Sequence, residues 1–244
     1  MSWHVPDADL ALDGDAVHVW RADSDCPGSR LEDLRKTLSA DELARAERFY
    51  LPRDRDRFIA RRSVLRAILG RYIAIDPSLM QFEYGTGRKP ALAARHHRAQ
   101  LRFNVSHSAG LVLYAITRSR DIGVDVERIE PAIAAERIPE QFFSPREVAE
   151  LRSLPVDVQP EAFFTCWTRK EAYVKAKGLG LALRLDRFDV SLSPGKPAAL
   201  LRTADDAHEA SRWSMRALAP AAGYAGALVV EGHAWQLSCW RWTA

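Results

Sequence analysis

The chain has 244 residues, of which 47% are hydrophobic and 27% are charged, and its formal net charge is only +3. Seven Trp, nine Phe and six Tyr are too much apolar mass for a disordered chain, and 13 Gly and 13 Pro are too few for a collagen-like one. The small net charge gives no indication of a dedicated nucleic-acid-binding protein.

The first predicted elements are a strand followed by two helices. Residues 16–20 (AVHVW) alternate in the way that is typical of a strand. Ser39, followed by acidic residues, is expected to cap a helix, and Pro52 is expected to break it. A second helix is predicted over residues 55–73 from its apolar stripe, and residues 85–90 (GTGRKP) form a turn-rich loop.

More strands and a long helix are predicted after this loop. Residues 101–106, 111–117 and 122–127 are predicted strands, and in the third one Ile, Val and Val alternate with Gly, Asp and Glu. Ser144 and the proline after it begin a helix, and a long helix over residues 161–177 ends at a pair of glycines. The remaining strands are predicted over residues 188–192, 213–218, 225–230 and 234–242.

These elements predict an α+β fold. Helices and a small sheet occur in each half of the chain, without the regular strand–helix alternation of a parallel α/β sheet. The boundary is predicted near residues 119–121, between two strands. It gives an N-terminal subdomain of residues 1–119 and a C-terminal subdomain of residues 120–244, which agrees with a length suited to one large domain or two small ones.

The cysteines and the apolar segments predict where the protein works. Cys26, Cys166 and Cys239 lie far apart, so neither a zinc ribbon nor a thioredoxin-type CxxC site is indicated. No stretch approaches the roughly 18–20 apolar residues of a membrane helix, and residues 1–15 do not resemble a secretory signal. We therefore expect a cytoplasmic protein that is not bound to a membrane.

Asp125 and Glu127 are the first candidate site residues. Their i, i+2 spacing on a strand places both carboxylates on one face, a few Å apart. Two like charges that close are costly unless a cation neutralises them, and a divalent ion that prefers oxygen ligands, Mg²⁺ first, would do so. The alternative is an exposed strand face with ordinary solvated acids.

Glu171 and Lys175 are the second candidate pair. Their i, i+4 spacing places them on the same face of the long helix. Taken alone this is a helix salt bridge, and Lys170 and Lys177 could equally be solvated. Trp167, one turn earlier, is more typical of a core residue than of a ligand contact.

Residues 104–108 (NVSHS) end a strand with small polar side chains and a histidine. Such groups can present hydrogen-bond donors at a sheet edge. His107 would contact a phosphate at neutral pH only if a partner favours its charged form, and the alternative is a structural histidine. No Ser-His-Asp triad can be argued from the residue order, so hydrolase chemistry of that kind is not predicted.

A run of arginines follows Ser39. Guanidinium groups suit phosphate oxygens, so two or three of these residues are expected to contact a ligand, and the others to lie on solvated helix faces. Arg88 and Lys89 add cations to the loop of residues 85–90, whose spacing is not that of a P-loop. The run comprises Arg45, Arg48, Arg53, Arg55, Arg57, Arg61, Arg62, Arg66 and Arg71.

Each of these signals is weak alone, but their order in the chain is specific. The segments FNVSHS, IGVDVE, FFSPREVAEL and WTRKEAYVKAKGLGL follow one another between residues 103 and 181. This order resembles that of the 4′-phosphopantetheinyl transferases of the long, Sfp-like type, and the resemblance covers roughly residues 39–192. It implies an α+β fold of two similar, pseudo-twofold-related subdomains, with coenzyme A bound in the cleft between them and a monomeric protein.

The resemblance also implies a role for each candidate residue. Asp125, Glu127 and Glu171 would hold Mg²⁺, with Mn²⁺ as the alternative ion, and Lys175 would bind the phosphates of coenzyme A. Ser106 and His107 would lie near the nucleotide, with His107 at the 3′-phosphate. The further cofactor-binding positions would be Lys89, Arg45 and Arg57.

The implied reaction is transfer of 4′-phosphopantetheine from coenzyme A to a serine of an apo acyl or peptidyl carrier protein, with release of 3′,5′-ADP. Glu171 is the candidate base and Glu127 the alternative, while Lys175 would add a cation beside the leaving group. The carrier is expected to dock on residues 128–143, unless this segment is an ordinary linking helix packed on the core. Carriers of nonribosomal peptide, polyketide or fatty-acid synthesis remain open.

Two other functions remain as alternatives. One is a non-catalytic module that binds coenzyme A or a nucleotide, and the other is a Mg²⁺-dependent hydrolase of a pyrophosphate. The intact DVE and KE…K residues favour the transferase over the module. Release of ADP without any carrier protein would favour the hydrolase.

Overall fold

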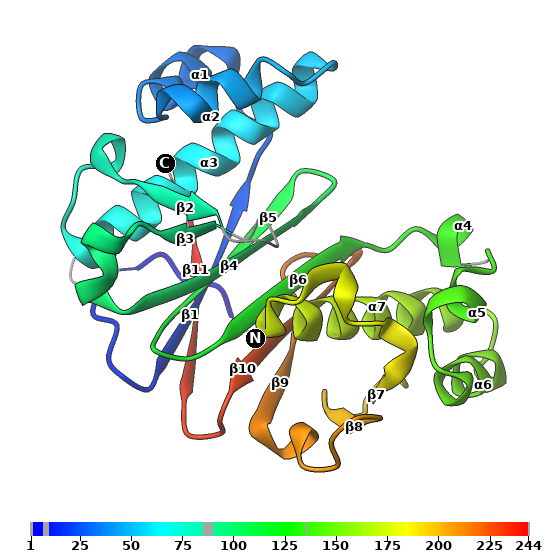
Figure 1. Ribbon diagram of the computed structural model, residues 1–244. Coiled ribbons are helices and arrows are strands. Elements are labelled where there is room, and N and C mark those ends of the chain that lie inside the picture. Colours follow the sequence, from blue (N-terminus) through cyan, green and yellow to red (C-terminus); the bar gives the residue numbers. More distant parts are fainter. Residues whose placement is uncertain (1, 7–9, 85–89, 135, 244) are drawn as a thin grey trace.

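Two small sheets form the centre of the computed structural model, which describes residues 2–6, 10–84, 90–134 and 136–243 (Figure 1). The first sheet has the order β11-β1-β5-β4 and the second the order β6-β10-β9. Their strands are β1 (Ala16–Asp23), β4 (Leu101–Ser108), β5 (Leu111–Arg118), β6 (Ile122–Arg128), β9 (Trp213–Leu218), β10 (Tyr224–Glu231) and β11 (Gln236–Arg241).

The sheets face each other across a shared apolar core. On β6, Ile122, Val124 and Val126 are each at most 1% exposed and contact residues of β1, β5 and β10 in this core. The alternation predicted for this strand therefore separates an apolar face, which binds the two sheets together, from the face that carries Asp125 and Glu127.

One long helix covers the outer face of each sheet (Figure 1). Helix α3 (Pro52–Ile73) packs Leu65, Ile68 and Leu69 on the first sheet. Helix α7 (Gln159–Lys177) packs its apolar side chains on the second. Pro52 is the first residue of α3, three residues earlier than predicted, because a proline at the first helical position loses no hydrogen bond.

The chain runs twice through the same order of elements. The first half is β1, α3 and the hairpin β4–β5, and the second is β6, α7 and the hairpin β9–β10. In each half the second hairpin strand lies in the middle and pairs with the first strand in antiparallel fashion. This confirms the predicted α+β fold. The strand β11 does not follow the pattern, since it pairs with β1 in parallel on the first sheet.

Helix α2 (Ala40–Ala46) begins at the predicted cap, where Ser39 and Glu42 form a capping box. Helix α1 (Gly28–Arg35) was not predicted, and it has no buried residue that could have produced an apolar stripe. The other elements are α4 (Pro131–Ala134), α5 (Ile138–Phe142), α6 (Pro145–Ser153), β2 (Phe82–Tyr84), β3 (Pro90–Leu92), β7 (Phe188–Val190) and β8 (Leu200–Thr203).

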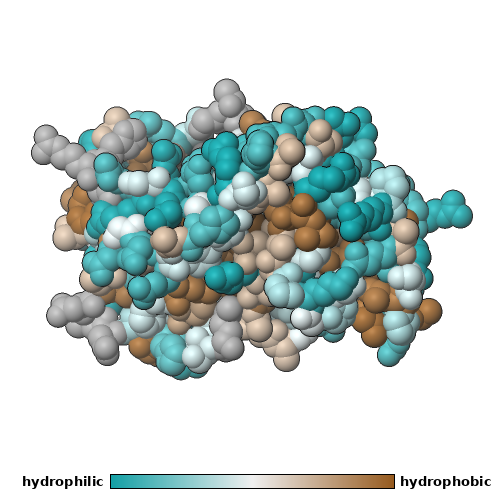
Figure 2. Space-filling view, turned by 90° about the horizontal axis from the view of Figure 1, so that it is seen from below, coloured by the Kyte–Doolittle hydropathy of each residue, from teal (hydrophilic) through white to brown (hydrophobic). Residues whose placement is uncertain are grey.

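The surface is mixed in character. Figure 2 shows a mainly hydrophilic face with separate apolar patches. Among the described helices, none is long and apolar enough to cross a membrane.

Candidate active site

Two sheet edges meet at the strands β4 and β6, and side chains join them. Asn104, Ser106 and Ser108 project from β4 as a row, which we call the polar seam. Their side-chain oxygens accept hydrogen bonds from three successive alternate N–H groups of β6, at 3.0, 3.4 and 3.1 Å. The seam thus satisfies backbone donors that would otherwise be left unpaired at the edge of the second sheet.

Helix α7 lies unusually close to β6 because of Gly123. A Cβ atom at this position would lie 2.0 Å from the carbonyl oxygen of Ala172 and 2.4 Å from the amide nitrogen of Ala176. Only glycine allows this approach. It brings the helix face with Glu171 and Lys175 against the polar face of the strand.

Asp125 is the most buried acid of the site, with 2% of its surface exposed. Its Oδ1 accepts hydrogen bonds from Ser106 Oγ and Lys175 Nζ, both at 2.6 Å, and Lys175 Nζ also donates to Ser106 Oγ at 2.9 Å. Its Oδ2 is buried and receives no hydrogen bond from any described residue. One buried carboxylate oxygen of the site is therefore left without a donor among the described residues.

Glu127 lies two residues further along the same face of β6. Ser108 Oγ donates to its Oε2 at 2.7 Å. Desolvation raises the pKa of Glu127, and the negative charges of Asp125 and Glu171 add to the rise, against the opposing effects of Ser108 and Lys175. The carboxylate sits where additional positive charge would be stabilising.

Glu171 reaches the site from α7. Burial and the charge of Asp125 raise its pKa, and Lys175 opposes this. No described side chain donates a hydrogen bond to it, so its oxygens remain available to a ligand. The structure thus brings together the acids that the sequence placed on a strand and on a helix.

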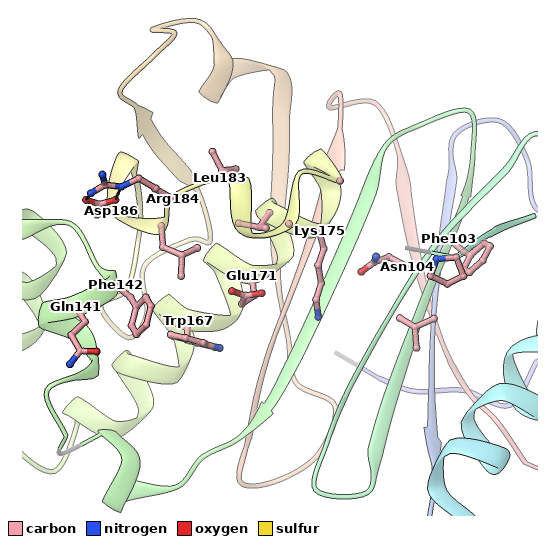
Figure 3. Close-up of a pocket in the computed structure, with 16 residues that line it drawn as sticks. Phe103, Asn104, Gln141, Phe142, Trp167, Glu171, Lys175, Leu183, Arg184 and Asp186 are labelled. Atoms are coloured by element: carbon pink, nitrogen blue, oxygen red, sulfur yellow. Dashed lines mark hydrogen bonds and ion pairs between the residues drawn. The ribbon is translucent and has the colours of Figure 1, made fainter. Parts of the chain in front are cut away.

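These side chains line a cavity of about 320 Å³. It adjoins a larger, more apolar cavity of about 720 Å³, and Val105, Trp167, Glu171 and Lys175 line both. Figure 3 shows the larger cavity, with Glu171 and Lys175 on α7 and Asn104 across from them on β4. The smaller cavity is lined by Val105, Ser106, His107, Asp125, Glu127, Trp167, Glu171 and Lys175.

The chemistry of this donor set fits a hard divalent cation. Three carboxylates share one small cavity, one of their oxygens is buried without a donor, and two of them have a raised pKa. As the side chains stand, however, no three acidic, histidine or cysteine residues of the described chain converge closely enough to hold a metal ion. The Lys175 ammonium takes the place of a cation at Asp125. The metal assignment therefore stays a prediction.

His107 lies at one wall of the smaller cavity. The residue as a whole is partly open to solvent, but desolvation of the imidazole lowers its pKa to about 4, and the positive charges of Arg61 and Lys175 contribute. The imidazole is neutral at pH 7 in the absence of an anion. A phosphate at this position would face several cationic groups at once.

Arg61 was not singled out from the arginine run. It lies four residues after Arg57 on α3, and its charge is close enough to lower the pKa of His107. No described acidic side chain forms an ion pair with its guanidinium, and burial lowers its pKa. The i, i+4 spacing from Arg57 was the signal that could have identified it.

The other predicted nucleotide contacts have different surroundings. Arg57 forms a two-pronged ion pair with Asp25, at 2.6 and 2.8 Å, and it holds the pKa of this carboxyl below its usual range. The Arg45 guanidinium stacks over the Phe58 ring, 5.3 Å from its centroid. Lys89 lies outside the described residues, so its role stays a prediction.

Lys170, which the sequence leaves open as a solvated side chain, is completely buried. Its ammonium pairs with Glu147 at 2.7 Å and donates to the carbonyl oxygens of Leu185 and Phe188 at 2.7 and 2.6 Å. Leu185 lines the larger cavity. Lys170 is therefore a structural residue that ties the wall of this cavity to α7.

Comparisons with known proteins agree with this arrangement. A family model described as the 4′-phosphopantetheinyl transferase superfamily matches residues 121–229, and one described as 4′-phosphopantetheinyl transferase, N-terminal, matches residues 26–119. The chain is 42% identical to the 4′-phosphopantetheinyl transferase HetI of Nostoc sp. over 241 aligned residues. This alignment covers 99% of this chain and 98% of the relative. The chain is 34% identical over 158 residues to the 4′-phosphopantetheinyl transferase Sfp of Bacillus subtilis, covering 64% and 66% of the two chains.

Proposed function

The chain belongs to the 4′-phosphopantetheinyl transferase superfamily and is an enzyme of that class, and from this premise we propose its substrates and the roles of its residues. It transfers the 4′-phosphopantetheinyl group of coenzyme A to a serine hydroxyl of an apo carrier protein, and 3′,5′-ADP leaves. The observation that carries the proposal is the single cavity in which three acids adjoin Lys175 and His107. Phosphoryl transfer requires such a combination of charges rather than a covalent intermediate.

Coenzyme A binds with its phosphates against the cationic side of the cavity. Lys175 binds the pyrophosphate, because its ammonium already lies among the acids of the site. His107 and Arg61 bind the 3′-phosphate, with Ser106 beside them and Arg45, Arg57 and Lys89 as further cofactor-binding residues in this half. Support comes from the closeness of Arg61 to His107 and from the absence of a described acid that pairs with it.

Asp125, Glu127 and Glu171 hold a divalent cation, Mg²⁺ or Mn²⁺. Such an ion, when bound, neutralises charge on the pyrophosphate oxygens. Two observations support this role: the buried Oδ2 of Asp125 has no donor among the described residues, and the Glu171 carboxylate lines the same cavity without a described donor. Lys175 would then leave Asp125 for the substrate phosphates.

Glu171 is the base that accepts the proton of the carrier serine. Its carboxylate is free of described hydrogen-bond donors and lines both cavities, so a serine hydroxyl brought to the site can reach it. Glu127 is the alternative, but it already accepts a hydrogen bond from Ser108. Whichever acid is the base must be ionised to accept a proton, so the rate should fall as the pH drops through the pKa of that carboxyl.

The carrier protein docks on the second half of the chain, beside the larger cavity. Residues 128–143 include α4 and α5, and Phe142, which is 43% exposed, lines this cavity next to Trp167 and Glu171. A carrier bound there would bring its serine to the acids. In this proposal residues 1–119 bind the nucleotide end of coenzyme A, residues 120–244 hold the metal and the carrier, and the enzyme is a monomer.

The test is intact-protein mass spectrometry of an apo peptidyl carrier and an apo acyl carrier, each incubated with this protein, coenzyme A and Mg²⁺. A gain of one phosphopantetheine that is lost with EDTA supports the proposal and ranks the two carriers. Coenzyme A binding without transfer to either carrier would favour the non-catalytic module. Release of ADP without a carrier would favour the hydrolase.

A further inference from the structure

We propose that Ser108 is a positioning residue that fixes the Glu127 carboxylate toward the metal. This inference rests on the proposed function, because it takes Glu127 as a metal ligand. Ser108 does not line the cavity that holds the acids, so it acts through Glu127 rather than on the substrate.

Both hydrogen-bonding directions of the Ser108 hydroxyl are in use. Its Oγ accepts from the backbone N–H of Arg128 at 3.1 Å and donates to Glu127 Oε2 at 2.7 Å. A hydroxyl that accepts from a fixed backbone donor has its proton directed elsewhere, here at the carboxylate. A backbone N–H of β6 therefore fixes the Ser108 oxygen, and the hydroxyl proton points at the acid on the same strand.

The same arrangement occurs one step earlier along the polar seam. Ser106 Oγ accepts from the N–H of Val126 and donates to Asp125 Oδ1 at 2.6 Å. Two alternate serines of β4 thus each donate to one of the two alternate acids of β6, Ser106 to Asp125 and Ser108 to Glu127. The polar seam therefore positions the two acids of the second half through side chains of the first half.

Glu127 needs such a bond more than Asp125 does. Asp125 is 2% exposed and also pairs with Lys175, whereas Glu127 is half-buried and has a longer side chain with more rotamers to lose. Glu127 shares its small cavity with two further carboxylates, those of Asp125 and Glu171, so like charges oppose its placement there. Ser108 is the described donor that holds its carboxylate against this repulsion.

Partners that orient a metal ligand commonly change metal affinity by about 10- to 100-fold when they are removed. We expect Ser108→Ala to weaken Mn²⁺ binding in the presence of coenzyme A by about that factor, measured by electron paramagnetic resonance. Coenzyme A affinity in EDTA, measured by calorimetry, should equal that of the parent. Ser108→Thr, which retains the hydroxyl, should restore Mn²⁺ binding.

Ser193→Ala is the matched control. Ser193 Oγ donates to Glu150 Oε1 at 2.5 Å, so this variant also removes a serine–glutamate hydrogen bond, but away from the cavity. Its Mn²⁺ and coenzyme A affinities should match those of the parent. In a Glu127→Gln background, Ser108→Ala should add little further loss, because both changes remove the same interaction.

The outcomes separate the two levels of the proposal. If the parent protein binds no Mn²⁺, the metal assignment fails and the role of Ser108 fails with it. If the parent binds Mn²⁺ and Ser108→Ala binds it equally well, only the role of Ser108 is overturned. If Ser108→Ala loses as much coenzyme A affinity in EDTA as it loses Mn²⁺ affinity, Ser108 has a general structural role, and the proposal is also overturned. Should Ser108→Ala not fold, a loss of Mn²⁺ binding in folded Ser108→Thr would refute the proposal.

Discussion

The strands beneath the two long helices present different side chains to them. The strand β1 directs His18, Trp20 and Ala22 toward α3. The strand β6 directs Gly123, Asp125 and Glu127 toward α7. Trp20 has no exposed surface, and it fills the space between β1 and α3 together with apolar side chains of the helix. In the second half the equivalent space holds a glycine and two acids, and a cavity lies beside them.

His18, the polar residue under α3, also has surroundings that differ from those of the acids under α7. His18 Nδ1 lies 2.8 Å from the hydroxyl of Tyr72, and Trp20 Nε1 donates to the same hydroxyl at 2.8 Å. Burial lowers the pKa of His18 to about 4, so the ring is neutral and its Nδ1 has a partner. One copy of the repeated order thus closes its strand–helix interface as core. The other brings the helix backbone against Gly123 and leaves two acids beside a cavity. We infer that the site arises from missing side-chain bulk in one half rather than from a different fold.

The largest effect should come from Asp125→Asn, which removes charge from the open interface and keeps the volume. We expect the transfer rate to fall by roughly 10³-fold or more, because the buried carboxylate holds both the proposed metal and Lys175. The control is Asp189→Asn on β7, where a carboxylate of 1% exposure pairs with Arg202 away from the cavity. Comparable activity of the two variants in the mass-spectrometric assay would contradict the contrast between the halves.

Gly123→Ala tests whether missing bulk makes the site. The new methyl group would overlap the backbone of α7 at Ala172 and Ala176, so the helix must shift. We expect a loss of about 3 kcal/mol of stability, seen as a lower unfolding midpoint, together with loss of transfer. Gly14→Ala is the control, since a Cβ there meets nothing within 4 Å. An unfolding midpoint equal to that of the parent would show that the close approach is not needed.

Lys175→Ala should weaken coenzyme A binding by about 10- to 100-fold, because a charge-assisted bond to phosphate is lost. Lys177→Ala is closely matched: the same helix carries it, its side chain is 26% exposed against 28% for Lys175, and it pairs with Glu209 at 2.7 Å. Calorimetry should give the Lys177 variant the affinity of the parent. Unchanged affinity in the Lys175 variant would remove this residue from the phosphate site.

The smallest effect concerns the proton on His107. Its pKa of about 4 leaves it neutral at pH 6, and a bound 3′-phosphate would raise this pKa, so coenzyme A binding should take up a proton. Because the bound state then holds more protons, affinity should increase by about two- to fivefold from pH 8 to pH 6 through this group. The phosphate itself also titrates near pH 6, so the comparison must be made with His107→Gln.

Calorimetry in buffers of different ionisation heat measures this uptake. The parent protein should take up more protons than His107→Gln at pH 6, and His233→Gln should behave as the parent. His233 is a suitable control because it follows β10 and bonds Ser214 and the carbonyl oxygen of Ser211 at the start of β9, and it lines neither cavity of the site. Equal proton uptake in the parent and His107→Gln would place the 3′-phosphate elsewhere.

The sequence predicted the local parts of this arrangement well. The alternation at residues 122–127 and the i, i+4 pair Glu171 and Lys175 both lie in the expected elements, because these patterns are properties of a single strand or helix. The polar seam and the bond between Asp125 and Lys175 could not be predicted, since they join residues far apart in the chain. Lys170 was left open because its partners, Glu147 and two carbonyl groups, come from other elements.

The parallel pairing of β11 with β1 has a consequence for how the protein is made. Ala16 is registered with Gln236, and His4 forms a bridge with Trp240, so the first sheet includes strands from opposite ends of the sequence. During synthesis the open edge of β1 has no partner until the ribosome has released residue 241. The half that binds the nucleotide in our proposal is therefore translated first, but its sheet is completed last. Contacts between residues so far apart in the sequence slow its folding.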